Sequence, residues 1–274
     1  MDGASSASTR GKTAAVLLAL PLVLSACTGG DPGDTPAPSG SGPVASSPAP
    51  SSSSAAPSPS PTGDPEASSA PPPLTGPLPS FTAEDLADAA REMAENHPGA
   101  RARTSQEIAG QTETGQALLD DMDITPAKCA PFMDNQEATL PAGALIASVT
   151  IPGDTVNRES YVSLASYPDR AAAAAAVSRT ADLISRCGSF DLSLGDTAGT
   201  AAVDREKTTT RAETTVGYRM DVSAGEQGVA SYTVSGSDGA VVVSATTRDE
   251  HEKDIVPGDV ADQLDEALEA LRTQ

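Results

Sequence analysis

The sequence predicts an α+β fold in which an antiparallel β-sheet is covered on one face by helices. Two patterns support this prediction. Short runs of alternating apolar and polar residues follow one another between residues 145 and 245, and tight turns separate them, as in hairpin strands. Helical patterns with one apolar stripe each lie at 82–97, 169–186 and 259–271. Because a single stripe packs on one partner layer, we expect these helices to share one sheet face.

The first helix begins at a capping box, since Thr82 and Asp85 stand three residues apart and Phe81 precedes them as a hydrophobic staple. Its apolar stripe consists of Leu86, Ala89, Ala90 and Met93. The sequence Asn96-His97-Pro98-Gly99 ends the helix, because proline cannot continue it and glycine favours its C-terminal cap.

Residues 114–134 are expected to form one or two short helices, with Cys129 in the second. The inward side chains of this segment are predicted to be Leu118, Leu119 and Met122. Strands are expected at 145–151 and 159–166, because Pro152-Gly153-Asp154 forms a turn between two apolar runs.

The longest helix is rich in alanine and runs from Asp169 to Arg186. Val177, Ala181 and Ile184 lie on one side of it, and Cys187 continues that side, so its thiol is expected to point toward the core. Further strands are expected at 211–222, 229–234 and 240–245, with turns at 225–228 and 237–239. The terminal helix places Val260, Leu264, Ala267, Leu268 and Leu271 on one side.

The start of the chain is typical of a secretory signal peptide. Arg10 and Lys12 precede an apolar run at 14–24, which spans about 16 Å as a helix and is too short to cross a bilayer. Leu24-Ser25-Ala26-Cys27 resembles the lipobox of bacterial lipoproteins, in which the cysteine thiol receives a diacylglyceryl group and becomes the new N-terminus. The alternative is an ordinary signal peptide followed by a chance cysteine. We expect residues 1–26 to be removed and Cys27 to be the lipid anchor, on the extracytoplasmic face of the cell membrane.

A linker is predicted over residues 27–80. Residues 28–80 contain 15 prolines and 13 serines among 53 residues, with no lysine, arginine or aromatic side chain. Such a composition buries too little apolar surface to offset the entropy of ordering, so we expect a disordered stalk that O-glycosylation can modify. Residues 81–274 then form a single domain of ordinary length.

The folded domain is strongly acidic. The chain has 17 basic and 38 acidic side chains, of which residues 1–80 hold two and five, so 15 and 33 remain and give a formal charge of −18. This field opposes binding to nucleic acid and to anionic lipid headgroups, and it favours cations or basic partners. The alternative is that the charge only keeps the domain soluble. The excess of arginine over lysine, with abundant alanine, indicates a GC-rich genome, such as that of an actinobacterium.

Two cysteines remain in the domain, Cys129 and Cys187. Outside the cytoplasm an even number of cysteines predicts a disulfide bond. A zinc site needs further ligands at close spacing, and the sequence has none beside these two residues. We therefore expect a disulfide and no metal or other cofactor.

Recognisable catalytic motifs are missing from the sequence. His251-Glu252 begins like the zinc-protease motif HExxH, but Ile255 occupies the position of the second histidine. The sequence has neither a Gly-x-Ser-x-Gly motif nor a serine three residues before a lysine. His97 falls in the helix stop. The carboxylates at Asp120, Asp121 and Asp123 are interpreted as a charged helix end, with weak cation binding as the alternative. The chain is therefore not expected to be an enzyme.

The order of the elements resembles the PknH-like extracellular sensor domain of mycobacterial kinases and actinobacterial lipoproteins. The likeness rests on Tyr167-Pro168-Asp169-Arg170-Ala171, Ser185-Arg186-Cys187 and Gly239-Ala240-Val241-Val242-Val243, and it covers residues 102–273. The family often has a tryptophan where this chain has Ile184, and it usually has a second disulfide. The resemblance implies that the domain binds an extracellular ligand and names none.

We therefore expect a monomeric, membrane-anchored lipoprotein whose sensor-like domain binds an unknown extracellular small molecule or an envelope protein. The alternatives are a structural or complex-forming envelope subunit, a lipid carrier and a hydrolase. A carrier is disfavoured because large apolar residues are few, which leaves little surface to line a wide cavity.

Arg211 and Arg219 lie in the alternating strand 211–222, on the side away from its apolar row. We expect this side to contribute to any ligand site, on a sheet face that the helices leave open. The alternative is that both arginines form surface ion pairs with Glu213 and Asp221.

Overall fold

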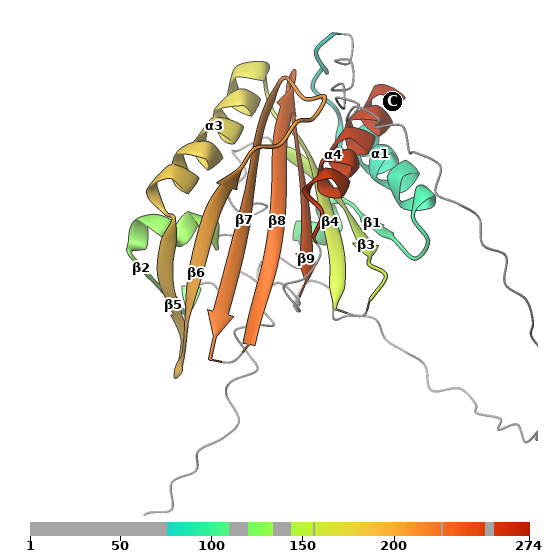
Figure 1. Cartoon of the computed structure of the whole chain (residues 1–274). Helices are drawn as coiled ribbons and strands as arrows, with labels where there is room; N and C mark the ends of the chain where they lie inside the picture. Colours follow the sequence, from blue (N-terminus) through green and yellow to red (C-terminus); the bar gives the residue numbers. More distant parts are fainter. Residues whose placement is uncertain (1–75, 110–119, 134–143, 156, 226, 250–254) are drawn as a thin grey trace, which may run out of the picture. The chain divides into compact units, whose positions relative to one another are not determined.

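The computed structural model describes residues 76–109, 120–133, 144–155, 157–225, 227–249 and 255–274. In this part of the chain a nine-stranded sheet with antiparallel pairing is packed between helices, which confirms the α+β class (Figure 1). The strands are β1 (Arg101–Arg103), β2 (Met122–Thr125), β3 (Leu145–Pro152), β4 (Arg158–Ser166), β5 (Ser189–Leu194), β6 (Thr197–Glu206), β7 (Thr214–Ala224), β8 (Gln227–Asp238) and β9 (Val241–Asp249). The helices are α1 (Ala83–Asn96), the 3₁₀ helix η2 (Ala127–Phe132), α3 (Arg170–Arg186) and α4 (Pro257–Arg272).

Most of the sheet consists of hairpins between strands that follow one another in the chain. Its order is β1-β3-β4-β9-β8-β7-β6-β5-β2, so β5 to β9 form a meander and β9 pairs with β4 of the first hairpin. Helix α3 takes the chain from β4, the third strand from one edge of the sheet, to β5, the second strand from the other edge. The predicted hairpins around residues 152–154 and 237–239 are both present.

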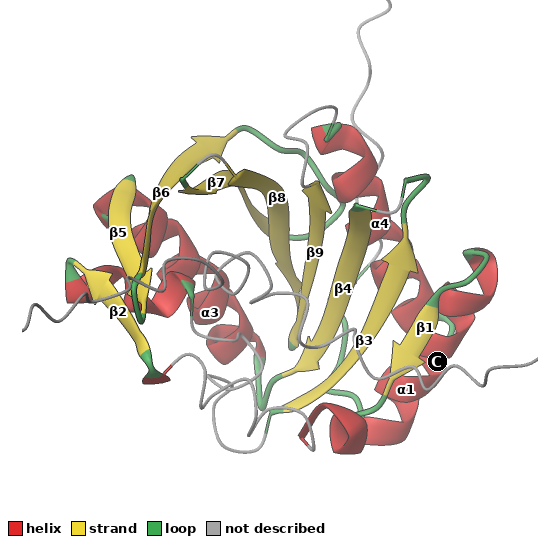
Figure 2. Ribbon diagram, turned by 90° about the horizontal axis from the view of Figure 1, so that it is seen from below, coloured by secondary structure: helices red, strands yellow, loops and turns green. Residues whose placement is uncertain are grey.

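The helices lie on both faces of the sheet, which corrects the expectation that all of them share one face. Helices α1 and α4 pack on Leu164 and Val243, whereas α3 packs on Tyr218 and Val242. Because adjacent residues of a strand point to opposite faces, Val242 and Val243 of β9 place the two helix layers on opposite sides. Figure 2 shows α3 inside the curve of the sheet and α1 and α4 outside it.

A strand that is buried on both of its faces explains this arrangement. The segment from Val241 to Ala245 is buried throughout, so β9 has apolar side chains on both of its faces. One helix layer covers only one of these faces, and the other needs a second layer.

Helix α1 begins as the sequence predicted. The Thr82 hydroxyl accepts a hydrogen bond from the Asp85 backbone N–H, and the Asp85 carboxylate accepts one from the Thr82 N–H. The stripe from Leu86 to Met93 is buried against the sheet and α4.

The segment before η2 differs from its prediction. Met122 was expected on the inner side of a short helix, but it is buried in the edge strand β2, opposite Leu194 of β5. Four residues are too few to distinguish a helical period from a strand period, and pairing with β5 decides the conformation. Cys129 does lie in a short helix, as expected. Leu118 and Leu119 fall outside the described residues.

Residues 76–80, which composition indicated as part of the linker, contact the sheet and α4. Leu78 is 4% exposed, its N–H donates to Asp238 Oδ1 at 3.3 Å, and its carbonyl accepts from the Ala240 N–H at 3.0 Å. Arg272 of α4 donates to the Gly76 carbonyl at 2.9 Å and to Asp238 Oδ2 at 2.6 Å. Residues 76–80 therefore belong to the folded domain. Among the residues that the structure describes, no helix is long and apolar enough to span a membrane.

Candidate functional site

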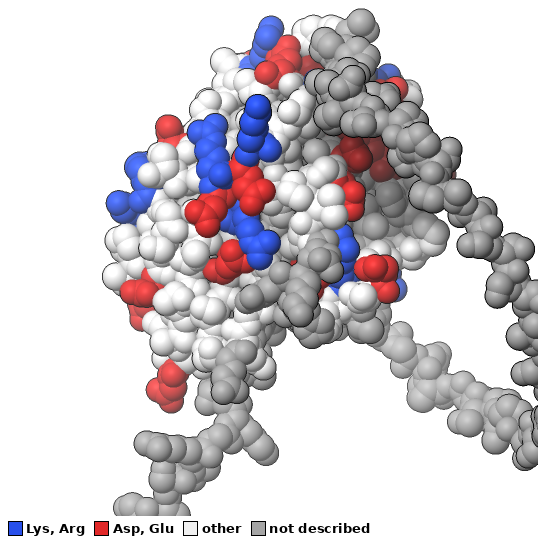
Figure 3. Space-filling view, viewed as in Figure 1, with Lys and Arg blue, Asp and Glu red and all other residues white. Residues whose placement is uncertain are grey.

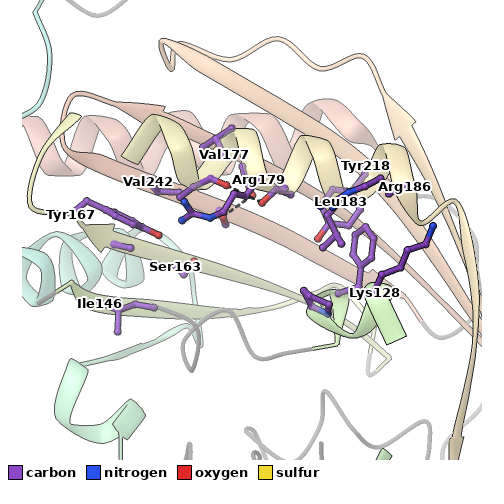
Figure 4. A pocket seen from close by; sticks show the side chains of 17 residues that line it. Lys128, Ile146, Ser163, Tyr167, Val177, Arg179, Leu183, Arg186, Tyr218 and Val242 are labelled. Carbon is purple, nitrogen blue, oxygen red and sulfur yellow. Dashed lines mark hydrogen bonds between the residues drawn. The ribbon is translucent and has the colours of Figure 1, made fainter. Parts of the chain in front are cut away.

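A pocket of about 560 Å³ lies between α3, η2 and the strands on the inner side of the curved sheet. We call it the α3 pocket. Figure 4 shows Arg179 between helix and strands near its middle, with Tyr167 on one side and Tyr218 and Leu183 on the other. Its volume falls in the range of small-molecule sites. The residues that line it are Lys128, Pro131, Phe132, Ile146, Ser163, Ala165, Tyr167, Ala176, Val177, Arg179, Thr180, Leu183, Arg186, Tyr218, Ser235, Val242 and Ser244.

Helix α3 faces the pocket with a stripe that runs beside the stripe packed on the sheet. The buried stripe consists of Ala173, Val177 and Ile184. The neighbouring stripe consists of Ala176, Arg179, Leu183 and Arg186, at spacings of three, four and three residues. Residues at these spacings share one side of a helix, so the four side chains line the same wall.

The disulfide bond fixes a second wall. Cys129 and Cys187 are bonded, as predicted, and their Cα atoms lie 5.6 Å apart, so η2 is joined to the end of α3. The ring of Phe132 in η2 stacks on Phe190, with a centroid distance of 5.9 Å, and meets Tyr218 edge-on at 5.7 Å. The bridge and the ring contacts together hold Phe132 as a side wall of the α3 pocket.

A row of serines forms the floor. Ser148, Ser163, Ser244 and Ser235 are direct cross-strand neighbours on β3, β4, β9 and β8, and all are buried. The last three line the pocket, and the hydroxyls of Ser235 and Ser244 are hydrogen-bonded at 2.7 Å. Among the described residues the Ser148 hydroxyl has no hydrogen-bond partner. Serine has a small side chain, so this row leaves room beneath α3.

Sequence reasoning missed this row. Ser244 lies in a run that was interpreted only as a buried strand, and Ser163 lies between apolar neighbours. The only signal is a serine at an inward position of several strands. Without the register, nothing indicates that these serines lie side by side.

Two tyrosines add hydroxyl groups at the rim and the floor. Burial raises the pKa of Tyr218, and its hydrogen bond with Thr233 acts in the opposite direction. Burial also raises the pKa of Tyr167, and the charge of Arg179 opposes that shift. Both phenols therefore stay protonated at neutral pH and act as neutral hydrogen-bond donors.

The charged residues of the lining are all basic. They are Lys128 from η2 and Arg179 and Arg186 from α3, and no described carboxylate lines the pocket. The Arg186 side chain donates from Nε to the Asp182 carbonyl at 3.2 Å.

Arg211 and Arg219 lie away from this pocket and form ion pairs. Arg211 lies before β7 and approaches Asp265 and Glu269 of α4 at 4.0 and 3.8 Å. Arg219 lies 2.7 Å from Asp221 on the same strand. Figure 3 shows basic and acidic side chains intermixed over β6 and β7, on the face away from α3. The pair of Arg219 with Asp221 matches the alternative interpretation, whereas Arg211 pairs with residues of α4 and not with Glu213, which binds Arg170. A role of these arginines in ligand binding stays a prediction.

The remaining candidates do not form a catalytic or metal site in the described part of the chain. His97 Nε2 lies 2.8 Å from Glu266 Oε2 in a part-buried hydrogen bond. Asp121 and Asp123 are exposed at the start of the edge strand β2. No group of three or more metal-binding side chains occurs among the described residues. Cys27 and His251 lie outside them.

Comparisons with known proteins give structural likeness alone. The chain matches no protein-family model and no curated protein. It is similar to the crystal structure of the extracellular domain of PknH from Mycobacterium tuberculosis, at 12% identity over 72% of this chain and 100% of that chain, with a TM-score of 0.49. It is also similar to an uncharacterised protein from Mycobacterium smegmatis, the Rv0999 ortholog, at 15% identity over 68% of this chain and 96% of that chain, with a TM-score of 0.40. At TM-scores below 0.5, neither likeness leads to a conclusion about function.

Proposed function

We propose that this chain is an extracytoplasmic lipoprotein, anchored through Cys27, whose domain binds a small molecule in the α3 pocket without chemical conversion. The single observation behind the binding role is the pocket itself. It has a volume of about 560 Å³, hydroxyl groups on its floor, aromatic and aliphatic walls and basic side chains with no described carboxylate in the lining. Apolar walls combined with polar groups that can orient a ligand are characteristic of small-molecule sites.

A variant that fills the pocket tests the binding role. Ala176 lines the pocket, whereas its neighbour Ala175 is exposed and does not. We expect Ala176→Trp to fill the pocket and Ala175→Trp to leave it open. Each protein is incubated with an extract of envelope small molecules, and bound species are detected by native mass spectrometry. A bound mass in the wild type and in Ala175→Trp that is lost in Ala176→Trp supports the proposal. No bound mass, or one that Ala176→Trp retains, contradicts it.

Replacement of the lipidated cysteine tests the anchor. The proposal rests on the lipobox pattern that ends at Cys27. Cys27→Ala should release the protein from the membrane fraction and abolish labelling by a fatty-acid analogue, because one or more acyl chains hold the protein on the bilayer. Ser25→Ala changes a neighbouring residue and keeps the thiol, so it should retain the label. Membrane retention of Cys27→Ala would refute the anchor.

A further inference from the structure

The α3 pocket is basic although the domain is acidic. Lys128, Arg179 and Arg186 line it without a described carboxylate, while residues 81–274 carry a formal charge of −18. At physiological salt, interactions between charges more than about 8 Å apart are largely screened. The three basic side chains are the charged groups of the described lining, and they attract an anionic group.

Arg179 is available for such a group. Several other arginines of the described chain are bound to carboxylates, such as Arg170 to Glu213 at 2.9 Å and Arg272 to Asp238 at 2.6 Å. No described carboxylate pairs with Arg179, which lies near the middle of the pocket (Figure 4). Its planar fork of N–H donors matches the oxygens of a carboxylate or a phosphate.

The floor provides further hydrogen bonds. Ser163, Ser235 and Ser244 face the pocket. Ser148 lies next to Ser163 but outside the lining, and its buried hydroxyl has no described partner. Buried hydroxyl groups lower the stability of a protein unless they are hydrogen-bonded. A ligand whose polar group has several oxygens satisfies such a floor.

The walls are apolar. Phe132 of η2 and Leu183 of α3 are apolar residues of the lining, as are Val177, Val242 and Ile146. Contact between these side chains and an apolar ligand body lowers the free energy of the complex. A small inorganic anion has no such body and would leave most of the apolar lining without contacts.

We propose that the α3 pocket binds a small amphipathic anion, a molecule with a carboxylate or phosphate group and an apolar body. The anionic group contacts Arg179 and the serine hydroxyls, and the apolar body lies against Phe132 and Leu183. This inference rests on the proposed binding role and adds the chemical class of the ligand.

Three probes of equal chain length test it by isothermal titration calorimetry below their micelle concentrations. Laurate and dodecyl phosphate are anionic, and monolaurin is neutral. The protein is the chain from residue 27 onward with Cys27→Ala, compared with the same chain carrying Arg179→Gln or Arg170→Gln. Arg170 lies on the same helix, is paired with Glu213 and does not line the pocket, so it is the matched control. Far-UV circular dichroism verifies that each variant is folded.

We expect at least one anionic probe to bind at least tenfold more tightly than monolaurin, and the tighter of the two identifies carboxylate or phosphate as the preferred group. Arg179→Gln should weaken this probe about tenfold or more, as expected for the loss of a charge-assisted hydrogen bond, while Arg170→Gln leaves its affinity unchanged. Equal binding of neutral and anionic probes, or equal effects of the two variants, overturns the inference and leaves the binding role intact. Failure of all three probes also overturns it, and the extract experiment with Ala176→Trp then decides the binding role separately.

Discussion

Removal of the disulfide bond should destabilise the domain by about 4 kcal/mol. The bond closes a loop with a sequence separation of 58 between Cys129 and Cys187. In the chain-entropy model, closing a loop of this size lowers the entropy of the unfolded chain by about 14 cal/mol/K, which corresponds to about 4 kcal/mol at 25 °C. Both cysteines are buried, so replacing them by alanine also removes two sulfur atoms from the core and adds to the loss.

Urea unfolding of the chain from residue 27 onward measures this effect. The Cys27→Ala protein is compared with the same protein carrying Cys129→Ala and Cys187→Ala. The free energy of unfolding should fall, and the m value should rise, because an unfolded chain without the crosslink exposes more surface. The reduced and alkylated protein, with its natural cysteines, is the second reference and should show a loss of similar size. A loss below about 1 kcal/mol with an unchanged m value would refute the entropic reasoning.

Three further changes test other parts of the fold. Leu164→Ala removes a fully buried side chain and should lower the free energy of unfolding by about 2–5 kcal/mol in urea, whereas a loss within error would contradict the core position. Gly239→Ala introduces a Cβ at φ +56° that collides with the backbone of Leu78, so the segment 76–80 should become more sensitive to limited proteolysis; unchanged protection would contradict the contact. Hydrogen bonds from the side chain and the backbone of Thr82 lower the pKa of Asp85. A lowered folded-state pKa stabilises the protein above the unfolded-state value and ceases to do so as the pH falls through the folded-state value. Asp85→Asn should therefore be less stable than the wild type near pH 6 and equal to it at about pH 2, and a difference that persists at low pH would contradict this origin.

The sequence alone determined the features that depend on local chemistry. The capping box of Thr82 and Asp85 placed the start of α1, because both partners lie within one helical turn. Alternation of apolar residues predicted β7, and the turns at 225–228 and 237–239 predicted the β7–β8 and β8–β9 hairpins. The count of cysteines predicted the disulfide between Cys129 and Cys187.

Only the tertiary structure decided which face each helix covers and which side chains form the pocket. A helical stripe shows that a helix is packed on one side, but it does not select between the two apolar faces of β9. Ser163, Ser235 and Ser244 are separated by up to 81 positions and become neighbours through the register of three strands. The position of Arg179 is also a tertiary property, because α3 must lie across this serine row to bring Arg179 into the same pocket. These are long-range relations, and a local pattern in the sequence contains no record of them.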